Sequence, residues 1–486
     1  MTGDLDAVVV GAGPNGLAAA VTLARAGLSV RVYERAPQPG GGAATAELTL
    51  PGYRHDVCSA VHPLAFESRF FREFGLTQRV EFAVPEVSFA HPLDGGRAAI
   101  AHRDMDRTRE GLGRDGAAYA RLMRPLARRA AAVAELTGGS LLRLPRDPVV
   151  AGLLGLRTLE QGSPLWNLRF REPAAPALVT GVAAHSILAQ PSLGAAGAGL
   201  VLAAYGHARG WPIPRGGSQA IADAMAADLR AHGGEIVADA EVASLRELPR
   251  ARVRLLDTTP DALIRLAGDE LPPSYRAALG RFRYGNGVAK VDFALSAPVP
   301  WQNPEVRAAG TVHLGGTRAE IAAAENEVGR GRHPGRPYVL VSQPSLFDPG
   351  RAPEGRHVLW AYTHVPADSD VDVREVVIRQ IERFAPGFRD TVLALHSRTA
   401  VEIARHDPNY PGGDISAGAP TMAQLLRRPV LRPDPWRTPV PGLYLCSAST
   451  SPGPGVHGLA GWWSARSALR HEFGRSTPPD LSPRAV

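Results

Sequence analysis

A glycine-rich turn near the N-terminus constrains this chain more than any other feature. The segment Gly11-Ala-Gly13-Pro-Asn-Gly16 follows an apolar, β-branched stretch at residues 6–11 and precedes residues 14–26, whose apolar side chains recur at helical spacing. Residues 29–34 then alternate in polarity like a strand, and Glu34 ends this stretch 23 positions after Gly11. A G-x-G-x-x-G turn inside a strand–helix–strand unit, followed by an acidic residue at about this distance, is typical of a dinucleotide-binding fold.

Each part of the motif has a physical role. Gly11 permits the tight turn, Gly13 lets the backbone approach a pyrophosphate, and Gly16 lets the helix pack closely on the strand. The helix N-terminus offers unpaired N–H groups and the positive end of the helix dipole to phosphate groups. Glu34 can accept hydrogen bonds from ribose hydroxyls. We therefore expect a site for the ADP part of a dinucleotide; a glycine turn without function is the alternative.

The composition fits a globular protein in a reducing compartment. The chain has 486 residues, more than the ~100–200 residues of one domain, which favours two domains. Cys58 and Cys446 lack the spacing of metal ligands, so we expect neither a disulfide framework nor a metal site. The formal charge is +7, but the arginines are scattered singly and Lys290 is the only lysine, so the charge does not indicate nucleic-acid binding.

Two apolar segments share some features of targeting or membrane segments. Residues 7–27 are apolar, yet Asp4 and Asp6 precede them where a signal peptide has a basic region. Residues 173–206 contain no Asp, Glu, Lys or Arg, but Pro176 and Pro191 argue against a membrane-spanning helix. We expect a cytoplasmic protein, in which residues 173–206 either pack closely or line an apolar tunnel.

The remaining chain alternates between helical and strand-like regions. Residues 86–210 are expected to be mostly helical, whereas strand-like stretches dominate residues 287–403. The other predicted elements are helices at 218–232, 373–385 and 459–473, and strands at 235–242, 288–295, 338–343, 357–363 and 442–446. Residues 476–486 are expected to be frayed or disordered.

Two further motifs resemble those of FAD-binding proteins. A second glycine patch, Gly40-Gly-Gly42, follows Glu34 closely, as in the glutathione-reductase-like FAD fold. Residues 442–446 and the loop 451–458 resemble the C-terminal flavin motif of that class. In that motif a helix start faces the pyrimidine edge of the flavin, where negative charge develops on reduction.

Over nearly its whole length the chain resembles the phytoene-desaturase-like branch of the FAD-dependent amine oxidase and desaturase flavoproteins. Residues 51–56, 214–218 and 455–458 carry this resemblance beyond the glycine turn. It implies an α/β fold, with a Rossmann-like, glutathione-reductase-like FAD-binding domain and an inserted mixed α+β substrate domain. The implied FAD-binding domain comprises residues 1–85, about 212–284 and about 430–475, and the substrate domain comprises about 86–211 and about 285–429.

The resemblance implies FAD as the cofactor and a set of contact residues in the glycine turn, the second glycine patch and the C-terminal loop. The set is Gly11, Gly13, Pro14, Asn15, Gly16, Glu34, Arg35, Gly41, Gly42, Ala43, Val242, Ser449, Gly455, Val456, His457 and Gly458. The chain departs from the family pattern at three places near the flavin edge: residues 446–450 contain no carboxylate, Pro454 stands in a loop that is usually glycine-rich, and Trp462-Trp463 makes a bulky helix start.

Lys290 and His457 are the candidates for catalysis. Lys290 lies in a segment that resembles the amine oxidase strand whose lysine holds a water against flavin N5; an ordinary strand lysine paired with a surface acid is the alternative. His457 is either a general acid–base group or a support of its loop through backbone hydrogen bonds. His55 and Asp56 are expected to pair, either near the cofactor or as a buried structural pair.

These features together predict a FAD-dependent oxidoreductase. The resemblance implies a desaturase or dehydrogenase that passes hydride from a lipophilic, carotenoid-, isoprenoid- or polyene-like substrate to flavin N5. The alternatives are an oxygen-using amine or alcohol oxidase, which Lys290 favours, and a non-catalytic prenyl- or lipid-binding escort protein, against which the intact glycine turn and Glu34 argue. A tunnel at residues 173–206 would suit a small lipophilic substrate that is reached from a membrane surface, so peripheral membrane contact is a further expectation.

Overall fold

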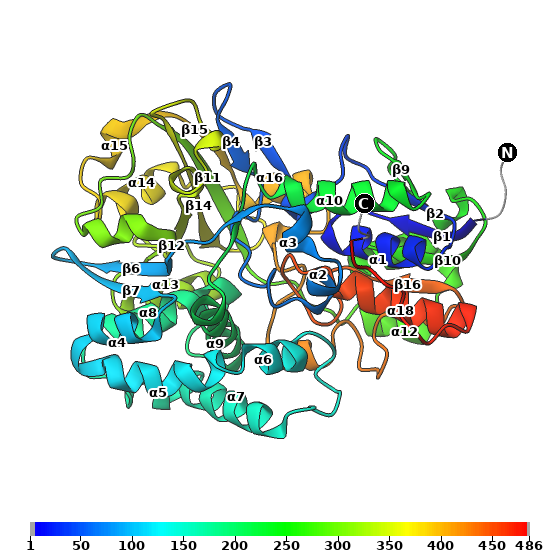
Figure 1. The fold of residues 1–486 in the computed structure, drawn as a ribbon, viewed down its shortest axis with the longest axis horizontal. Coiled ribbons are helices and arrows are strands. Elements are labelled where there is room, and N and C mark those ends of the chain that lie inside the picture. Colours follow the sequence, from blue (N-terminus) through cyan, green and yellow to red (C-terminus); the bar gives the residue numbers. More distant parts are fainter. Residues whose placement is uncertain (1–4, 484–486) are drawn as a thin grey trace.

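The N-terminal motif belongs to a parallel sheet in the computed structural model, which describes residues 5–483. This sheet has five strands in the order β16-β10-β1-β2-β9 (Figure 1). Its strands are β1 (Leu5–Val10), β2 (Val30–Tyr33), β9 (Glu235–Val237), β10 (Ala251–Leu256) and β16 (Leu443–Leu445), and every neighbouring pair is parallel.

Both faces of the parallel sheet are covered, because successive side chains of β1 point to opposite faces. Ala7 and Val9 belong to one apolar cluster with the helices α1 (Pro14–Arg25), α10 (Gln219–Ala231) and α18 (Leu459–Phe473). Val8 and Val10 belong to another with α11 (Pro260–Ala267) and α12 (Pro273–Leu279). Burial on both faces explains why this strand is a continuous apolar run in the sequence.

A second, mixed sheet has seven strands in the order β15-β11-β14-β13-β12-β6-β7. Its neighbours pair antiparallel except β12 and β6, which are parallel. The strands are β6 (Val87–Leu93), β7 (Arg97–His102), β11 (Gly287–Leu295), β12 (Ala309–Leu314), β13 (Val339–Ser342), β14 (His357–Val365) and β15 (Val392–Arg398).

The two faces of this mixed sheet differ in chemistry. Ala289, Val291 and Phe293 of β11 pack with α14 (Arg374–Glu382) in one apolar cluster. The alternate residue Lys290 pairs with Tyr362 of β14 and Arg398 of β15, and Leu340 of β13 pairs with both Tyr362 and His313. Directly paired residues share a face. A mostly polar row therefore crosses the face opposite to α14.

A layer of helices lies below the mixed sheet in Figure 1, and it includes the charge-free segment 173–206. Its helices are α4 (Met105–Gly111), α5 (Gly116–Ala127), α6 (Ala130–Thr137), α7 (Pro148–Gln161), α8 (Ala174–Ala183) and α9 (Leu193–Ala208). Small residues permit close packing here: a Cβ on Gly199 of α9 would lie 2.8 Å from the Cα of Ala183.

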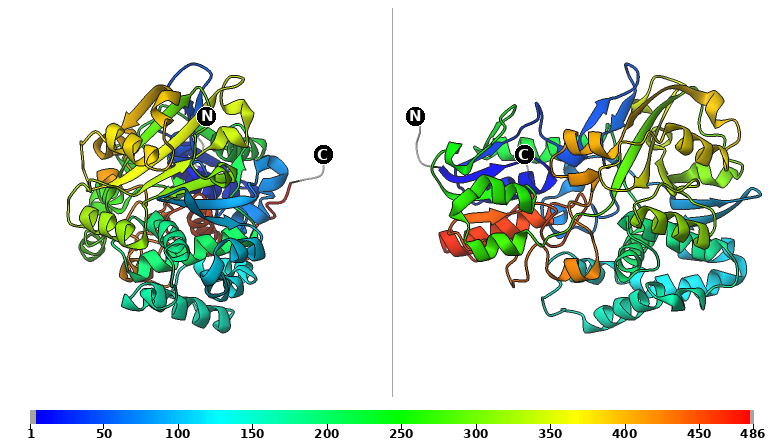
Figure 2. Two further views of the ribbon diagram at one scale, coloured as in Figure 1. Left: turned by 90° about the vertical axis from the view of Figure 1, so that its left-hand side faces the viewer. Right: turned by 180° about the vertical axis from the view of Figure 1, so that it is seen from behind.

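Shorter elements connect these layers. They are the strand pairs β3 (Thr45–Glu47) with β4 (Arg54–Asp56) and β5 (Phe82–Ala83) with β8 (Ile213–Pro214), and the helices α2 (Arg69–Glu73), α3 (Leu76–Arg79), α13 (Arg318–Gly329), α15 (Phe388–Thr391), α16 (Ala400–His406) and α17 (Met422–Leu426). Figure 2 shows the same elements from two further sides. Among residues 5–483, no helix combines the length and the apolarity that crossing a membrane requires.

Three expectations from the sequence need correction. Residues 86–210 are mostly helical, as expected, but they begin with the β6–β7 hairpin, which the prediction did not include; all seven residues of β6 are buried, so the burial of this strand shows no alternation. The strand expected at 235–242 ends at Val237. The tail is not frayed throughout, because Leu481 is only 2% exposed and joins the cluster around α1. The last part of that prediction, residues 484–486, lies outside the described residues.

Candidate cofactor and substrate site

A cavity of about 1030 Å³, called the main cavity below, extends between the two sheets and the helical layer. It begins at the glycine turn after β1 and reaches α6, α7 and α9. Its volume exceeds the range of about 300–1,000 Å³ that is usual for small-molecule sites. The main cavity is therefore large enough for a cofactor together with a substrate.

The two glycine patches touch each other at one end of the main cavity. A Cβ on Gly16 would lie 2.1 Å from the backbone oxygen of Gly11, so only glycine fits where α1 starts beside β1. A Cβ on Gly41 would lie 3.1 Å from the Cα of Gly13, and Gly41 has a φ of +51°. The two glycine patches together form a concave backbone surface, called the cradle below, which side chains at these positions would fill. The bare backbone of the cradle therefore fits the predicted pyrophosphate of FAD.

Glu34 is held in place at the end of β2. Its Oε2 accepts a hydrogen bond from the backbone N–H of Ala12 at 2.6 Å, and its Oε1 accepts one from Ala36 at 2.8 Å. The side chain stays partly exposed and lines the main cavity. Glu34 can therefore accept further hydrogen bonds from ribose hydroxyls, as the sequence predicts.

Asp257 is a site residue that the sequence analysis missed. It follows β10, and its Oδ2 accepts a hydrogen bond from the backbone N–H of Gly16 at 2.8 Å. Asn409 donates a hydrogen bond from its side chain to the backbone oxygen of Asp257 at 2.9 Å. Burial is the main cause that raises the pKa of Asp257 to about 8. At neutral pH its carboxyl group therefore carries a proton and places no negative charge next to the glycine turn.

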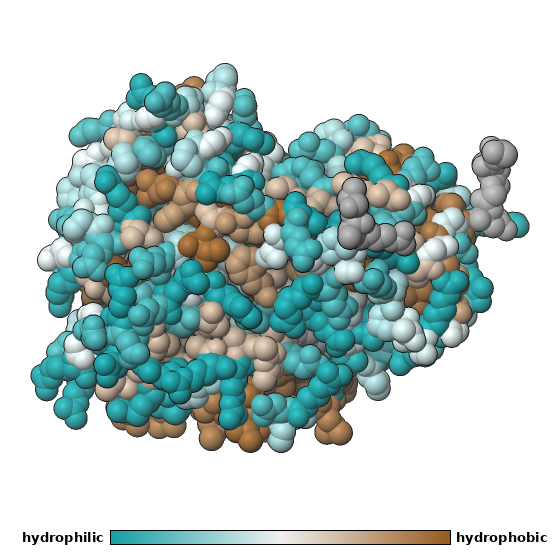
Figure 3. Space-filling view, viewed as in Figure 1, coloured by the Kyte–Doolittle hydropathy of each residue, from teal (hydrophilic) through white to brown (hydrophobic). Residues whose placement is uncertain are grey.

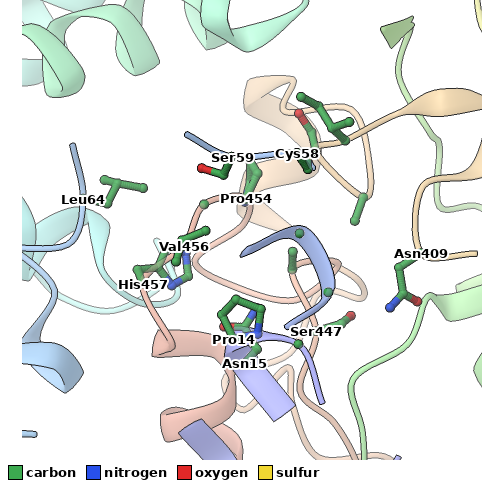
Figure 4. Close-up of a pocket in the computed structure, with 18 of the residues that line it drawn as sticks. Pro14, Asn15, Cys58, Ser59, Leu64, Asn409, Ser447, Pro454, Val456 and His457 are labelled. Atoms are coloured by element: carbon green, nitrogen blue, oxygen red, sulfur yellow. The ribbon is translucent and has the colours of Figure 1, made fainter. Parts of the chain in front are cut away.

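The C-terminal loop reaches the same end of the main cavity. In Figure 4, Pro14 and Asn15 at the start of α1 lie between Asn409 and the segment of Val456 and His457. Helix α18 approaches α1 closely, because a Cβ on Gly461 would lie 1.8 Å from the backbone oxygen of Asn15. The loop before α18 is thereby placed beside the glycine turn.

His457 supports this loop through both of its ring nitrogens. Its Nε2 lies 3.2 Å from the backbone oxygen of Gly453, and its Nδ1 accepts a hydrogen bond from the backbone N–H of Leu459 at 3.0 Å. Burial lowers the pKa of His457 to about 4. Of the two roles that the sequence left open, the contacts favour loop support, because both nitrogens already have backbone partners.

The predicted FAD contacts divide into two groups. Those that line the main cavity are Gly11, Gly13, Pro14, Asn15, Glu34, Arg35, Gly41, Gly42, Val242, Gly455, Val456 and His457. Gly16, Ala43, Ser449 and Gly458 lie behind it, and Ser449 donates a hydrogen bond to the backbone oxygen of Ala417. Ser447 lines the main cavity where Ser449 was expected.

Lys290 lies outside the main cavity, in a smaller pocket that it shares with Gly42, Cys58 and Tyr410. Its Nζ binds the carboxylate of Asp292, which is buried rather than at the surface. Burial lowers the pKa of Lys290, and burial likewise raises the pKa of Asp292 to about 6. Trp360 and Tyr362 line both pockets, so the Lys290 pocket adjoins the main cavity.

His55 and Asp56 do not form the expected pair. His55 bonds to Thr49 at 2.8 Å. Asp56 forms an ion pair with the buried Arg351 at 3.0 Å and accepts a hydrogen bond from the backbone N–H of Ser218 at 2.8 Å. As neighbours on a strand, the two side chains point to opposite faces. Asp56 instead ties the loop before α10 to the strand β4.

A pair of histidines forms a polar part of the wall near the mixed sheet. The Nε2 atoms of His185 and His313 lie 2.8 Å apart, and His185 lines the main cavity beside Trp211. Burial lowers the pKa of His185 to about 3, so the pair is neutral. The sequence analysis did not single out these residues, because a lone histidine on an apolar helix gives no local signal of a partner 128 positions away.

The wall formed by the helical layer and α17 is mostly apolar, with Thr137, Thr158 and Tyr205 as its polar side chains. It includes Leu136, Leu141, Ala151, Leu154, Leu159, Leu193, Gly197, Ala198, Val201, Leu202, Met422 and Leu425, and it contains no charged residue from α6, α7, α9 or α17. Part of the charge-free segment 173–206 therefore lines the main cavity.

Comparison with known proteins gives concordant results. A family model described as flavin containing amine oxidoreductase matches residues 15–460. The chain is 27% identical to the rat "Pyridine nucleotide-disulfide oxidoreductase domain-containing protein 2", over 96% of this chain and 94% of that protein. It is 27% identical to phytoene dehydrogenase of Streptomyces griseus, over 80% of this chain and 77% of that protein. Among solved structures, cyclohexylamine oxidase from Brevibacterium oxydans is similar with a TM-score of 0.57 at 15% identity, over 97% of this chain and 100% of that one.

Proposed function

Because the chain belongs to the family of flavin containing amine oxidoreductases, whose cofactor is FAD, we propose that this oxidoreductase desaturates or dehydrogenates a lipophilic substrate. Hydride leaves one substrate carbon, and a proton leaves the neighbouring carbon and is released to solvent, so that a C=C bond forms. FAD, when bound, supplies the acceptor for the hydride. The protein contributes binding, orientation and exclusion of water.

The uncharged, mostly apolar wall of the main cavity carries this proposal. Leu154 of α7, Val201 of α9 and Leu425 of α17 face one space that begins at the glycine turn. Apolar surface that leaves water on binding provides the driving force for an extended isoprenoid- or polyene-like chain. Small residues such as Gly197 leave room for that chain without adding polar groups.

The amine oxidase alternative is supported by a different observation. Trp360 and Tyr362 line the main cavity with ring centroids 5.1 Å apart and an interplanar angle of 89°. Aromatic faces attract an ammonium group by about 0.5–2 kcal/mol. The carboxylate of Glu67 also lines the main cavity, but it already forms ion pairs with Arg72 and Arg209, each at 3.4 Å. Glu67 is therefore not free to pair with an amine. The amine substrate is therefore the second candidate.

The visible spectrum of the purified flavoprotein distinguishes the candidates. We expect anaerobic addition of polyenes or isoprenoids to bleach the flavin band, and Val201→Asp to slow this bleaching while leaving flavin content unchanged. Bleaching by amines alone, lost in Trp360→Leu but kept in Val201→Asp, would establish the second candidate instead. A colourless protein that cannot be reconstituted with FAD would support the escort-protein alternative.

A further inference from the structure

We propose that the outer face of α7 and its flanking segments dock on an anionic phospholipid bilayer. The α7 surface is defined by Leu142, Leu144, Val149, Leu156, Leu159, Leu165 and Leu168. The proposal concerns a surface and a partner, so it stands whether the substrate is a polyene or an amine.

Exposed apolar side chains are concentrated on the α7 surface. Leu144 is 94% exposed and Leu168 is 79% exposed. Among the described residues, the large apolar side chains that are exposed outside residues 142–168 are Leu426 and Leu431, in and after α17, and Val371 and Leu393. In Figure 3 a brown band follows the lower edge of the molecule, where Figure 1 places α7. An apolar patch of this kind marks an interaction site rather than random exposure.

Helix α7 has apolar side chains on both faces. Val150 and Leu154 are buried, whereas Val149 and Leu156 on the other face are exposed. A helix that meets water on its outer face usually has polar residues there. The outer face of α7 therefore lacks the composition of a surface that only water contacts.

The α7 surface is continuous with the main cavity. Gly155 and Leu159 are exposed and also line that cavity. Met422 and Leu425 of α17 line it too, and α17 lies close to the helical layer in the views of both Figure 1 and Figure 2. Helix α7 thus borders the main cavity where the cavity reaches the protein surface. A lipophilic molecule that enters there passes from the bilayer into the cavity without crossing water.

Positive charge on and beside the α7 surface favours an anionic bilayer over a second copy of the chain. The guanidinium groups of Arg143, Arg171 and Arg427 form no ion pair with an acid among the residues that the structure describes, although Arg143 lies 4.0 Å over the Trp463 ring. Each stands within three positions of an exposed leucine. A symmetric contact between two copies would bring these arginines toward each other, whereas lipid phosphates would neutralise them.

Sedimentation of the FAD-loaded protein with lipid vesicles tests the proposal. We expect binding to vesicles of mixed phosphatidylglycerol and phosphatidylcholine, and weaker binding to phosphatidylcholine alone or at high salt. The variant L144S/L156S/L168S should bind at least about tenfold more weakly, because a leucine leaving water contributes roughly a factor of ten. The matched control V371S/L393S removes two exposed apolar side chains elsewhere and should bind like the wild type.

Flavin content and gel filtration keep the outcome interpretable. Both variants should retain FAD and elute as the wild type does, because none of the changed residues lines the main cavity. R171Q/R427Q should lose the preference for phosphatidylglycerol. The proposal is overturned if the wild type stays in the supernatant, if the leucine variant binds equally well, or if that variant turns a dimer into a monomer, which would identify a second copy as the partner.

Discussion

The proton on Asp257 makes FAD affinity depend on pH in a predictable way. Asp257 accepts the Gly16 N–H directly below the glycine turn, and its pKa is raised to about 8. When the predicted pyrophosphate binds at this turn, a neutral Asp257 adds no repulsion, whereas an ionised Asp257 does. Binding therefore selects the protonated form, and FAD affinity should fall as pH rises through about 8.

The size of the effect follows from proton linkage. If only the protonated form binds, the apparent Kd scales as one plus the ratio of ionised to protonated Asp257. From about pH 7 to about pH 9 the Kd should rise about tenfold, which corresponds to about 1.4 kcal/mol. Asp257→Asn keeps an oxygen that can accept the Gly16 N–H but cannot ionise, so its Kd should stay flat over the same range.

Quenching of FAD fluorescence on titration with apoprotein measures this Kd. A wild-type Kd that is constant from about pH 7 to about pH 9, or an equal rise in Asp257→Asn, would refute the reasoning. The free energy of unfolding offers a second readout. A carboxyl group whose pKa is raised on folding stabilises the fold less as pH increases from about 4 to about 8, and Asp257→Asn should remove that slope.

Three further variants test other parts of the site. Gly41→Ala should reduce bound flavin at least about tenfold, because the new Cβ would lie 3.1 Å from the Cα of Gly13 and because φ at this position is +51°. The control Gly152→Ala, which has open space around it, should keep its flavin. Equal flavin content in the two variants would contradict the predicted role of Gly41. Lys290→Met should lower the free energy of unfolding by about 3–5 kcal/mol, since it leaves the buried Asp292 with only His55, whose Nδ1 lies 3.6 Å from Asp292 Oδ1. K290M/D292L should restore most of this free energy, and failure of the double variant to recover in urea denaturation would argue against the pairing. His457→Ala should cost about 1–3 kcal/mol by leaving the Leu459 N–H without its acceptor, with the pH profile of flavin reduction unchanged, and a shifted profile would restore the acid–base role.

Local patterns predicted the cofactor end of the fold well. The glycine turn, α1 and Glu34 lie within one short stretch, so spacing alone places them together. The β6–β7 hairpin was missed because burial on both faces removes the alternation that identifies a strand, although its Asp94-Gly95-Gly96 turn was a usable signal.

Contacts between distant segments could not be predicted in the same way. Asp257 matters because β10 pairs with β1 and ends at the same sheet edge. Without a predicted strand at 251–256, nothing in the sequence connects that acid to Gly16. His185 and His313 meet for a similar reason, through packing of the helical layer on the mixed sheet.

The position of α1 between α10 and α18 has a consequence for how the protein is made. Residues that line the cofactor end of the main cavity span almost the whole chain, from Gly11 to His457. A ribosome must therefore release the chain beyond His457 before these residues can come together, and the apolar face of α1 that packs on α18 stays uncovered until then. We therefore expect flavin to bind only after α18 has been made, and a chain that ends before α18 should not retain flavin.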